Sequence, residues 1–381
     1  MDQNPDNEIL LLRVRLILQE GQHDRALTVL EGIQPENEAE QQEKAYLLGW
    51  GHTLAKRWDD ALSLLTPLPN FTEGEGDQEN RIDRERRALC NLHLGYAAVQ
   101  LARFEDASRH YAKCLKALQD KKIHLPLTQI KARYGLAMTC VMRGLYPAAI
   151  QHYELAIDLC DHIDDDVEIG NIYCGLCEAY RRAGNFIKAQ LAGEKALTLF
   201  EGSGDIYRQG LMHNYLGRIS LQLGDYRAAS DHYTEALALA ISDRSDRMMM
   251  VNCAALADLR LVEERLEEAR RYCLRAQEIT NRLLAKDGQL IGLTYLISGK
   301  VAQAEAERTE GEQRQRLLEE AVKWFNKAGD QLNATQSFTD VAELYGRWAQ
   351  ALEELGHYQE AIACWKNGYQ ALSSINGPAW F

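Results

Sequence analysis

The sequence predicts an all-α solenoid of about nine helix-turn-helix pairs, and three observations support this prediction. A phrase of glycine, any residue, aromatic, two residues and alanine recurs every 40 residues, ending at Ala149, Ala189 and Ala229. A small residue stands twelve positions before most of these alanines. Only 7 prolines occur, so long stretches lack the residue that most disrupts helix interiors. Self-similarity at a period of this length is typical of stacked repeats.

Weaker copies of the phrase extend the array in both directions. They end at Ala26, Ala61, Ala107, Ala269 and Ala361, and a ninth unit is centred on Ala321. We therefore expect helix pairs over residues 7–40, 42–75, 88–121, 130–163, 170–203, 210–243, 250–283, 287–335 and 342–375, with an acidic loop at 76–87. The first and last pairs are expected to act as caps. The segment ERTEGEQRQR interrupts the 287–335 unit, which predicts a longer first helix and a mobile turn there.

Each recurring position has a packing role. The small residue on the first helix lets it touch the second helix at the alanine; these residues are Gly49, Gly95, Ala137, Cys177, Gly217 and Ala257. The aromatic of the phrase is expected to open the second helix and plug the seam. A second ring four residues past the alanine is expected to fill the space between one pair and the next, at Tyr111, Tyr153, Tyr233, Phe325 and Trp365.

These residues resemble the tetratricopeptide repeat family over nearly the whole chain. The 40-residue period is similar to the lengthened variant in LGN-type adaptors and in the sensor arrays of bacterial helix-turn-helix and peptide-sensing regulators. The resemblance implies a right-handed superhelix whose first helices line a concave groove. In such a groove an adaptor binds a peptide or a segment of a partner protein.

The resemblance also implies which residues project into the groove, through repeat positions two, five, nine and twelve. The candidate partner-binding residues are Tyr96, Lys131, Tyr134, Asn171, Glu178, Arg181, Asn214, Arg218 and Asp258. An asparagine carboxamide can both donate to and accept from a peptide backbone, and arginine can hold a carboxylate with two hydrogen bonds. The alternative is that these are ordinary solvated side chains. The lysine and asparagine arrangement of chaperone-tail clamps is not reproduced.

The composition limits which partners the chain is expected to bind and in which compartment it is expected. The net charge of −13 opposes direct binding of nucleic acid unless basic residues are segregated. The sequence has neither an apolar run long enough for a membrane span nor the pattern of a signal peptide at its start, so we expect a cytoplasmic protein. The 9 cysteines lie at apolar helical positions, which favours reduced, buried thiols.

No motif for catalysis, metal or cofactor stands out. Cys174 and Cys177 form a CxxC without a second ligand pair, and the segment from Gly292 to Lys300 lacks the spacing of a phosphate loop. The sequence therefore predicts a non-enzymatic scaffold or adaptor. The first alternative is a peptide-sensing module of a bacterial transcription or signalling regulator without its effector domain. An enzyme of Rap-like dephosphorylation type would need a catalytic glutamine or acid in a separate N-terminal bundle, and the repeats begin too early to leave room for one.

Overall fold

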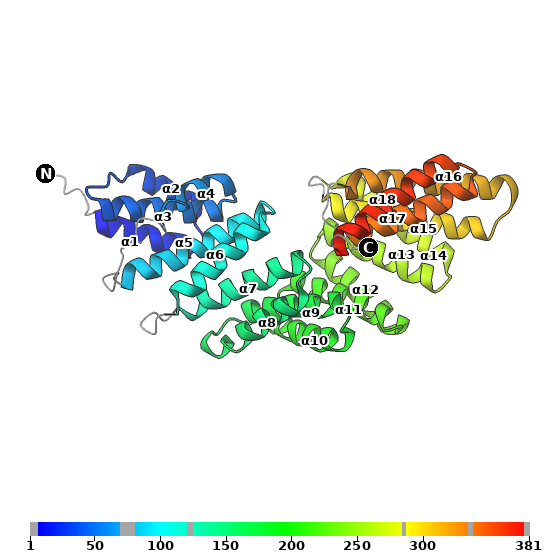
Figure 1. Ribbon diagram of the computed structural model, residues 1–381. Helices are drawn as coiled ribbons and strands as arrows, with labels where there is room; N and C mark the ends of the chain where they lie inside the picture. The colour runs from blue at the N-terminus through cyan, green and yellow to red at the C-terminus, as the bar shows by residue number, and fades with distance from the viewer. Residues whose placement is uncertain (1–6, 69–80, 120–124, 284–286, 334–337, 377–381) are drawn as a thin grey trace. The chain divides into compact units, whose positions relative to one another are not determined.

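The structure, a computed structural model, describes residues 7–68, 81–119, 125–283, 287–333 and 338–376. These residues form helices and turns, with no strand among them, so the predicted all-α fold is confirmed (Figure 1). The chain divides into two compact units, residues 1–185 and 186–381. Unit 1 contains α1 (Asn7–Gln19), α2 (His23–Gly32), α3 (Glu38–Leu54), α4 (Trp58–Leu65), α5 (Arg81–Gln100), α6 (Phe104–Ala117), α7 (Pro126–Met142), α8 (Tyr146–Ile157), the short η2 (Cys160–His162) and α9 (Asp166–Arg182). Unit 2 contains α10 (Phe186–Ser203), α11 (Ile206–Gln222), α12 (Tyr226–Ser242), α13 (Asp246–Val262), α14 (Leu266–Arg282), α15 (Gly288–Glu307), α16 (Gly311–Leu332), α17 (Phe338–Glu354) and α18 (Tyr358–Asn376).

The repeating alanine marks the contact between helices in every pair. Eight of the nine alanines, from Ala26 to Ala321, are 0% exposed, and Ala361 is 1% exposed. Five residues before the alanine, the turn requires a left-handed backbone, with φ of 74° at Gly144 and 77° at Gly184. Glycine adopts this conformation without steric cost. The same turn position is occupied by non-glycine residues with positive φ at Lys56, Ala102 and Glu264.

Rings fill the space between neighbouring pairs, as the sequence predicts. A Cβ added to Gly95 would lie 2.6 Å from the Tyr111 ring, and one added to Gly135 on the next pair would lie 2.3 Å from the same ring. Tyr111 is therefore enclosed by two successive first helices. They leave room for its ring because Gly95 and Gly135 have no side chain. In unit 2, Gly299 leaves the same space for Phe325. Trp365 differs, because 43% of it is exposed on the last described helix.

Most first helices begin one turn or more before the predicted residue, whereas α1 and α15 begin within one residue of it. α9 begins at Asp166 rather than residue 170, α11 at Ile206 rather than 210, and α13 at Asp246 rather than 250. The reason is capping: the side chains of Asp165, Asp205 and Ser245 accept hydrogen bonds from backbone N–H groups three residues on. Part of the extra length of a 40-residue unit therefore lies in longer helices.

Three further expectations need correction. Residues 81–87 belong to α5 and not to the predicted 76–87 loop, whose residues 76–80 lie outside the described part of the chain. In the irregular unit, the first helix α15 is longer, with 20 residues, as predicted, but the extra residues also lengthen α16 to 22 residues, so the turn consists only of residues 308–310. The aromatic that opens the second helix is not always a buried plug, since Tyr358 is 66% exposed.

Each unit has an inner side formed by its first helices. In unit 1, α1 contacts α3, α3 contacts α5, α5 contacts α7 and α7 contacts α9; in unit 2, α11, α13, α15 and α17 form a similar row. Within the described residues, no second helix approaches the next second helix to a comparable extent. The row whose helices lie closer together is the inside of the curve, so the first helices face inward in each unit.

Candidate partner-binding site

The inner side of unit 1 carries a group of aromatic side chains on α3 and α5. The Trp50 and His93 rings stack with centroids 5.6 Å apart, and the buried Tyr46 ring lies 6.1 Å from Trp50. Tyr96, one turn further along α5, packs edge-on against Trp58 at 5.7 Å and remains 44% exposed. The contact with Trp58 orients the Tyr96 ring while leaving part of it open to solvent.

Lys131 extends this surface onto α7. Its side chain is exposed, and among the described residues it forms no ion pair. Burial lowers the pKa of His93 to about 4, and the positive charge of Lys131 contributes to that shift. His93 is therefore neutral near pH 7, and Lys131 supplies the positive charge here. Tyr134, also on α7, is half-buried and packs edge-on against Tyr153 at 5.8 Å.

On α9, the predicted site residues bind one another. Arg181 donates two hydrogen bonds to Glu178, of 2.7 and 2.8 Å, and Arg182 donates a third. Burial alone would raise the pKa of Glu178, but the hydrogen bonds and charges of the two arginines outweigh it and hold the pKa at about 2. The guanidinium of Arg181 is thus already held by a carboxylate. Asn171 lies half-buried on the same helix.

In unit 2, most of the predicted residues also form hydrogen bonds or ion pairs within the fold. Asn214 is 4% exposed and donates a 2.8 Å hydrogen bond to Asn252, whose own amide donates to the Met248 carbonyl. The Asn214 carboxamide is therefore already hydrogen-bonded within the fold. The reason is that the first helices approach closely enough to bury it.

Two ion pairs that share one lysine connect three first helices of unit 2. Lys300 on α15 donates to Asp258 on α13 at 2.8 Å and lies 3.1 Å from Glu343 on α17. Asp258 is therefore neutralised within the fold. Arg218 on α11 is exposed and, among the described residues, forms no ion pair.

Sequence reasoning about single positions did not identify these pairings. Asn252 and Lys300 are the partners that occupy Asn214 and Asp258, and they lie 38 and 42 residues away. Both separations are close to the 40-residue period. Comparing the residues that stand at the same position in successive repeats would have suggested these pairings, because residues one period apart lie on adjacent first helices.

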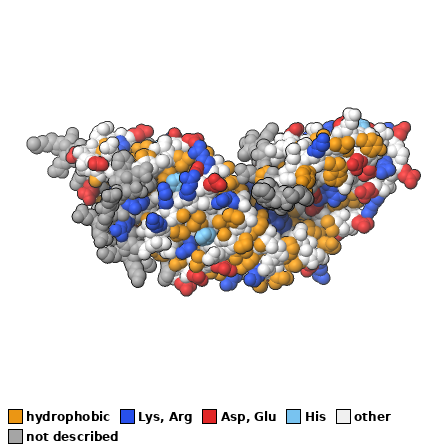
Figure 2. Space-filling view, in the orientation of Figure 1, with side chains coloured by type: hydrophobic (Ala, Val, Ile, Leu, Met, Phe, Trp, Pro, Cys, Tyr) orange, Lys and Arg blue, Asp and Glu red, His pale blue; other side chains and the backbone are white. Residues whose placement is uncertain are grey.

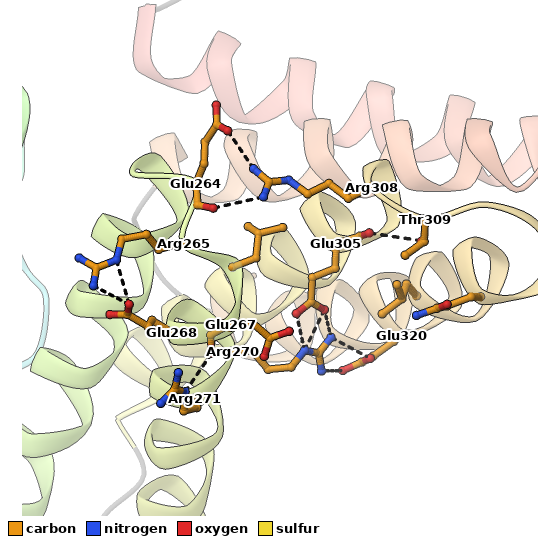
Figure 3. A pocket seen from close by; sticks show the side chains of 13 residues that line it. Glu264, Arg265, Glu267, Glu268, Arg270, Arg271, Glu305, Arg308, Thr309 and Glu320 are labelled. Carbon is orange, nitrogen blue, oxygen red and sulfur yellow. Dashed lines mark hydrogen bonds and ion pairs between the residues drawn. The ribbon is translucent and has the colours of Figure 1, made fainter.

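A pocket of about 700 Å³ lies between α14, α15 and α16. Figure 3 shows Arg270 pointing between Glu305 and Glu320, to which it donates hydrogen bonds. The hydrogen bonds to Glu305 raise the pKa of Arg270. At the rim, Arg308 donates to Glu264 at 2.9 Å. Much of the charge in this pocket is therefore compensated by other lining side chains.

Burial disfavours the thiolate form of the buried cysteines. Cys177 is buried at the small packing position, and burial raises its pKa, which disfavours the thiolate. Among the described residues, no group of three or more His, Cys, Asp and Glu side chains is placed to hold a metal ion. The described helices also include none that is long and apolar enough to cross a membrane.

The fold and its inner surface define a repeat protein of a known class. The tetratricopeptide repeat family model matches residues 128–202 and again residues 168–242, an offset equal to the 40-residue period. Residues 128–242 therefore match the sequence pattern of tetratricopeptide repeats, within a chain of helical pairs. The chain is 25% identical over 171 residues to Protein KINESIN LIGHT CHAIN-RELATED 2 of Arabidopsis thaliana, a match that covers 43% of this chain. The matched segment spans 25% of that relative's length.

Solved structures share the fold over most of the chain. The apo form of RapI is similar with a TM-score of 0.71 and 12% identity, covering 98% of this chain and 99% of RapI. NprR in complex with its cognate peptide NprX has a TM-score of 0.55 and 14% identity, covering 88% and 90%. Aspartyl phosphate phosphatase F from Bacillus subtilis has a TM-score of 0.53 and 15% identity, covering 92% and 98%. At these identities the likeness concerns the fold alone.

Proposed function

We propose that this protein is a scaffold or adaptor that binds a segment of another protein on the inner surface of unit 1. The observation that supports this concerns Tyr96 and Lys131, which lie on the neighbouring first helices α5 and α7. Both side chains are exposed on the inward row of first helices. We name the surface formed by Trp50, His93, Tyr96, Lys131 and Tyr134 the α5–α7 face.

The α5–α7 face offers the two kinds of contact that a peptide needs. An oriented, half-exposed tyrosine buries apolar area at little entropic cost, and its hydroxyl can still donate or accept a hydrogen bond. The Lys131 ammonium has three donors for backbone carbonyls or carboxylates. Glu178, Arg181, Asn214 and Asp258, by contrast, already satisfy one another or nearby residues. Binding there would first have to break those pairs.

The same face also fits the alternative of a peptide sensor. The support is the likeness of fold to NprR, which was solved with its cognate peptide. An adaptor and a sensor differ in the consequence of binding rather than in its location. We infer a binding role rather than an enzymatic one, since the inner surfaces present paired side chains and aromatic rings and burial disfavours the thiolate form of the buried cysteines.

Affinity capture with the full chain tests this proposal. The bait is compared with the double variant Tyr96→Ala, Lys131→Glu, and recovered proteins are identified by mass spectrometry. Titration calorimetry with the purified partner should then show at least a ten-fold loss of affinity. Lys113→Glu is the matched control, because Lys113 is an exposed lysine on the second helix α6 and makes the same change of charge. Equal affinity in the double variant would place the binding site elsewhere.

A further inference from the structure

The charge of the chain is strongly segregated along unit 1. Residues 81–153 contain 13 Lys and Arg against 5 Asp and Glu, a net of +8 in a protein whose total is −13. Residues 1–80 contain 6 against 16, a net of −10, and residues 154–180 contain 8 acidic and no basic residues. In a solenoid each pair contacts its neighbours, so the described parts of these blocks form bands across unit 1: residues 7–68 with a net charge of −4, residues 81–119 and 125–153 with +7, and residues 154–182 with −6. The basic band consists of α5 to α8 and lies between two acidic bands.

Two acidic residues within the basic band lie against arginines of the same band. Asp106 pairs with Arg109 on the same helix, and Glu105 lies 3.9 Å from Arg143. Lys113 and Lys131 are exposed and, among the residues that the structure describes, have no acidic partner. In Figure 2, Lys and Arg side chains gather on the visible surface of this part of unit 1. Lys113 and Lys131 therefore keep uncompensated positive charge in the band, whereas Arg86 pairs with Glu43 of the preceding acidic band.

We infer that the segment bound on the α5–α7 face is a short acidic peptide with an apolar side chain. This inference rests on the proposed function and specifies the chemistry of the ligand. Lys131 lies within the basic band and on the inner surface at the same time, so a ligand carboxylate there meets an ammonium without a competing acid. Tyr96, oriented by Trp58, provides the apolar contact.

The neighbouring acidic bands favour a peptide over a nucleic acid. Duplex DNA carries a charge about every 1.7 Å and is stiff over about 150 base pairs. A duplex laid across the basic band would continue onto the acidic bands, where it is repelled. A peptide of a few acidic residues stays within the basic band, because screening limits the reach of charges to about 8 Å at physiological salt.

Fluorescence anisotropy with two labelled peptides tests the inference on the full chain. One is an acidic peptide of three Glu-Asp-Leu-Gly repeats, and the other is its neutral counterpart of three Gln-Asn-Leu-Gly repeats. At low salt, the acidic peptide should bind at least ten-fold more tightly than the neutral one. Lys131→Glu should weaken that binding at least five-fold, Lys113→Glu less than two-fold, and a short DNA duplex should not displace the peptide.

The outcomes separate this inference from the proposed function. If both peptides bind equally and Tyr96→Ala weakens both while Lys131→Glu weakens neither, the face binds peptides without acidic preference and the inference is wrong. If the acidic peptide fails to bind even at low salt, or if DNA displaces it, the inference is also wrong. If both peptides bind and no change on the α5–α7 face affects either, the proposed function fails together with it.

Discussion

Two glycines on one helix provide a matched test of the packing between helices. A Cβ added to Gly217 of α11 would lie 2.6 Å from the ring of Tyr233, which is only 1% exposed. A Cβ added to Gly210 of the same helix would meet its nearest neighbour, Leu239, at 3.6 Å, an ordinary contact distance. Gly217→Ala should therefore be destabilising, whereas Gly210→Ala should be neutral or stabilising.

The expected magnitudes follow from two opposing effects. Replacing glycine by alanine inside a helix gains up to about 1 kcal/mol. Forcing a methyl group into a packed core costs about 1–3 kcal/mol. Gly217→Ala should then lose about 0–2 kcal/mol overall, and the two variants should differ by about 1–3 kcal/mol.

Urea unfolding followed by circular dichroism measures this difference, and hydrogen exchange locates it. Exchange should accelerate in α11 and α12 of the Gly217 variant, since stability in repeat arrays is nearly a sum of local terms. Equal stability of the two variants, with unchanged exchange in α11 and α12, would refute the assigned contact between Gly217 and Tyr233.

Three further predictions concern the remaining polar and thiol groups. Burial lowers the pKa values of His213 and His232, whose Nδ1 atoms are 3.1 Å apart, and the charge of His232 lowers that of His213 further, so unfolding takes up protons: stability should fall as pH drops below about 6.5, and replacing both by glutamine should flatten that dependence in thermal melts. Arg270→Gln leaves two carboxylates facing each other and should cost about 1–2 kcal/mol in urea unfolding after allowance for solvent screening; an unchanged midpoint would contradict the assigned network. Cys177→Ala should cost about 1 kcal/mol and leave partner affinity unchanged in calorimetry, whereas a lost stoichiometric zinc would reveal a metal site.

The fold was predictable because its determinants recur. The alanine register is read from the sequence alone, and it agrees with the burial of all nine alanines. The helix starts were less accessible, because caps such as Asp165 and Asp205 lie outside the repeated phrase. A polar residue before a helix does not by itself predict where the helix starts, because the hydrogen bond that makes it a cap is not visible in the sequence.

The binding surface was only partly predictable. Repeat position predicts which side chains face inward, and of these Tyr96 and Lys131 are exposed. Repeat position does not show whether an inward side chain is already engaged by its neighbour one period away, as Asn214 is by Asn252. That engagement depends on the distance between first helices, which the sequence of one repeat does not contain.

Photo-crosslinking from the inner surface tests the central claim most directly. A benzoylphenylalanine placed at Tyr96 keeps an aromatic ring at that position, and the same group at Tyr226, an exposed aromatic of unit 2, serves as the control. If the partner binds on the α5–α7 face, irradiation should join it to position 96 and not to position 226. Crosslinking from position 226 alone, or equally from both positions, would contradict a binding site on the α5–α7 face.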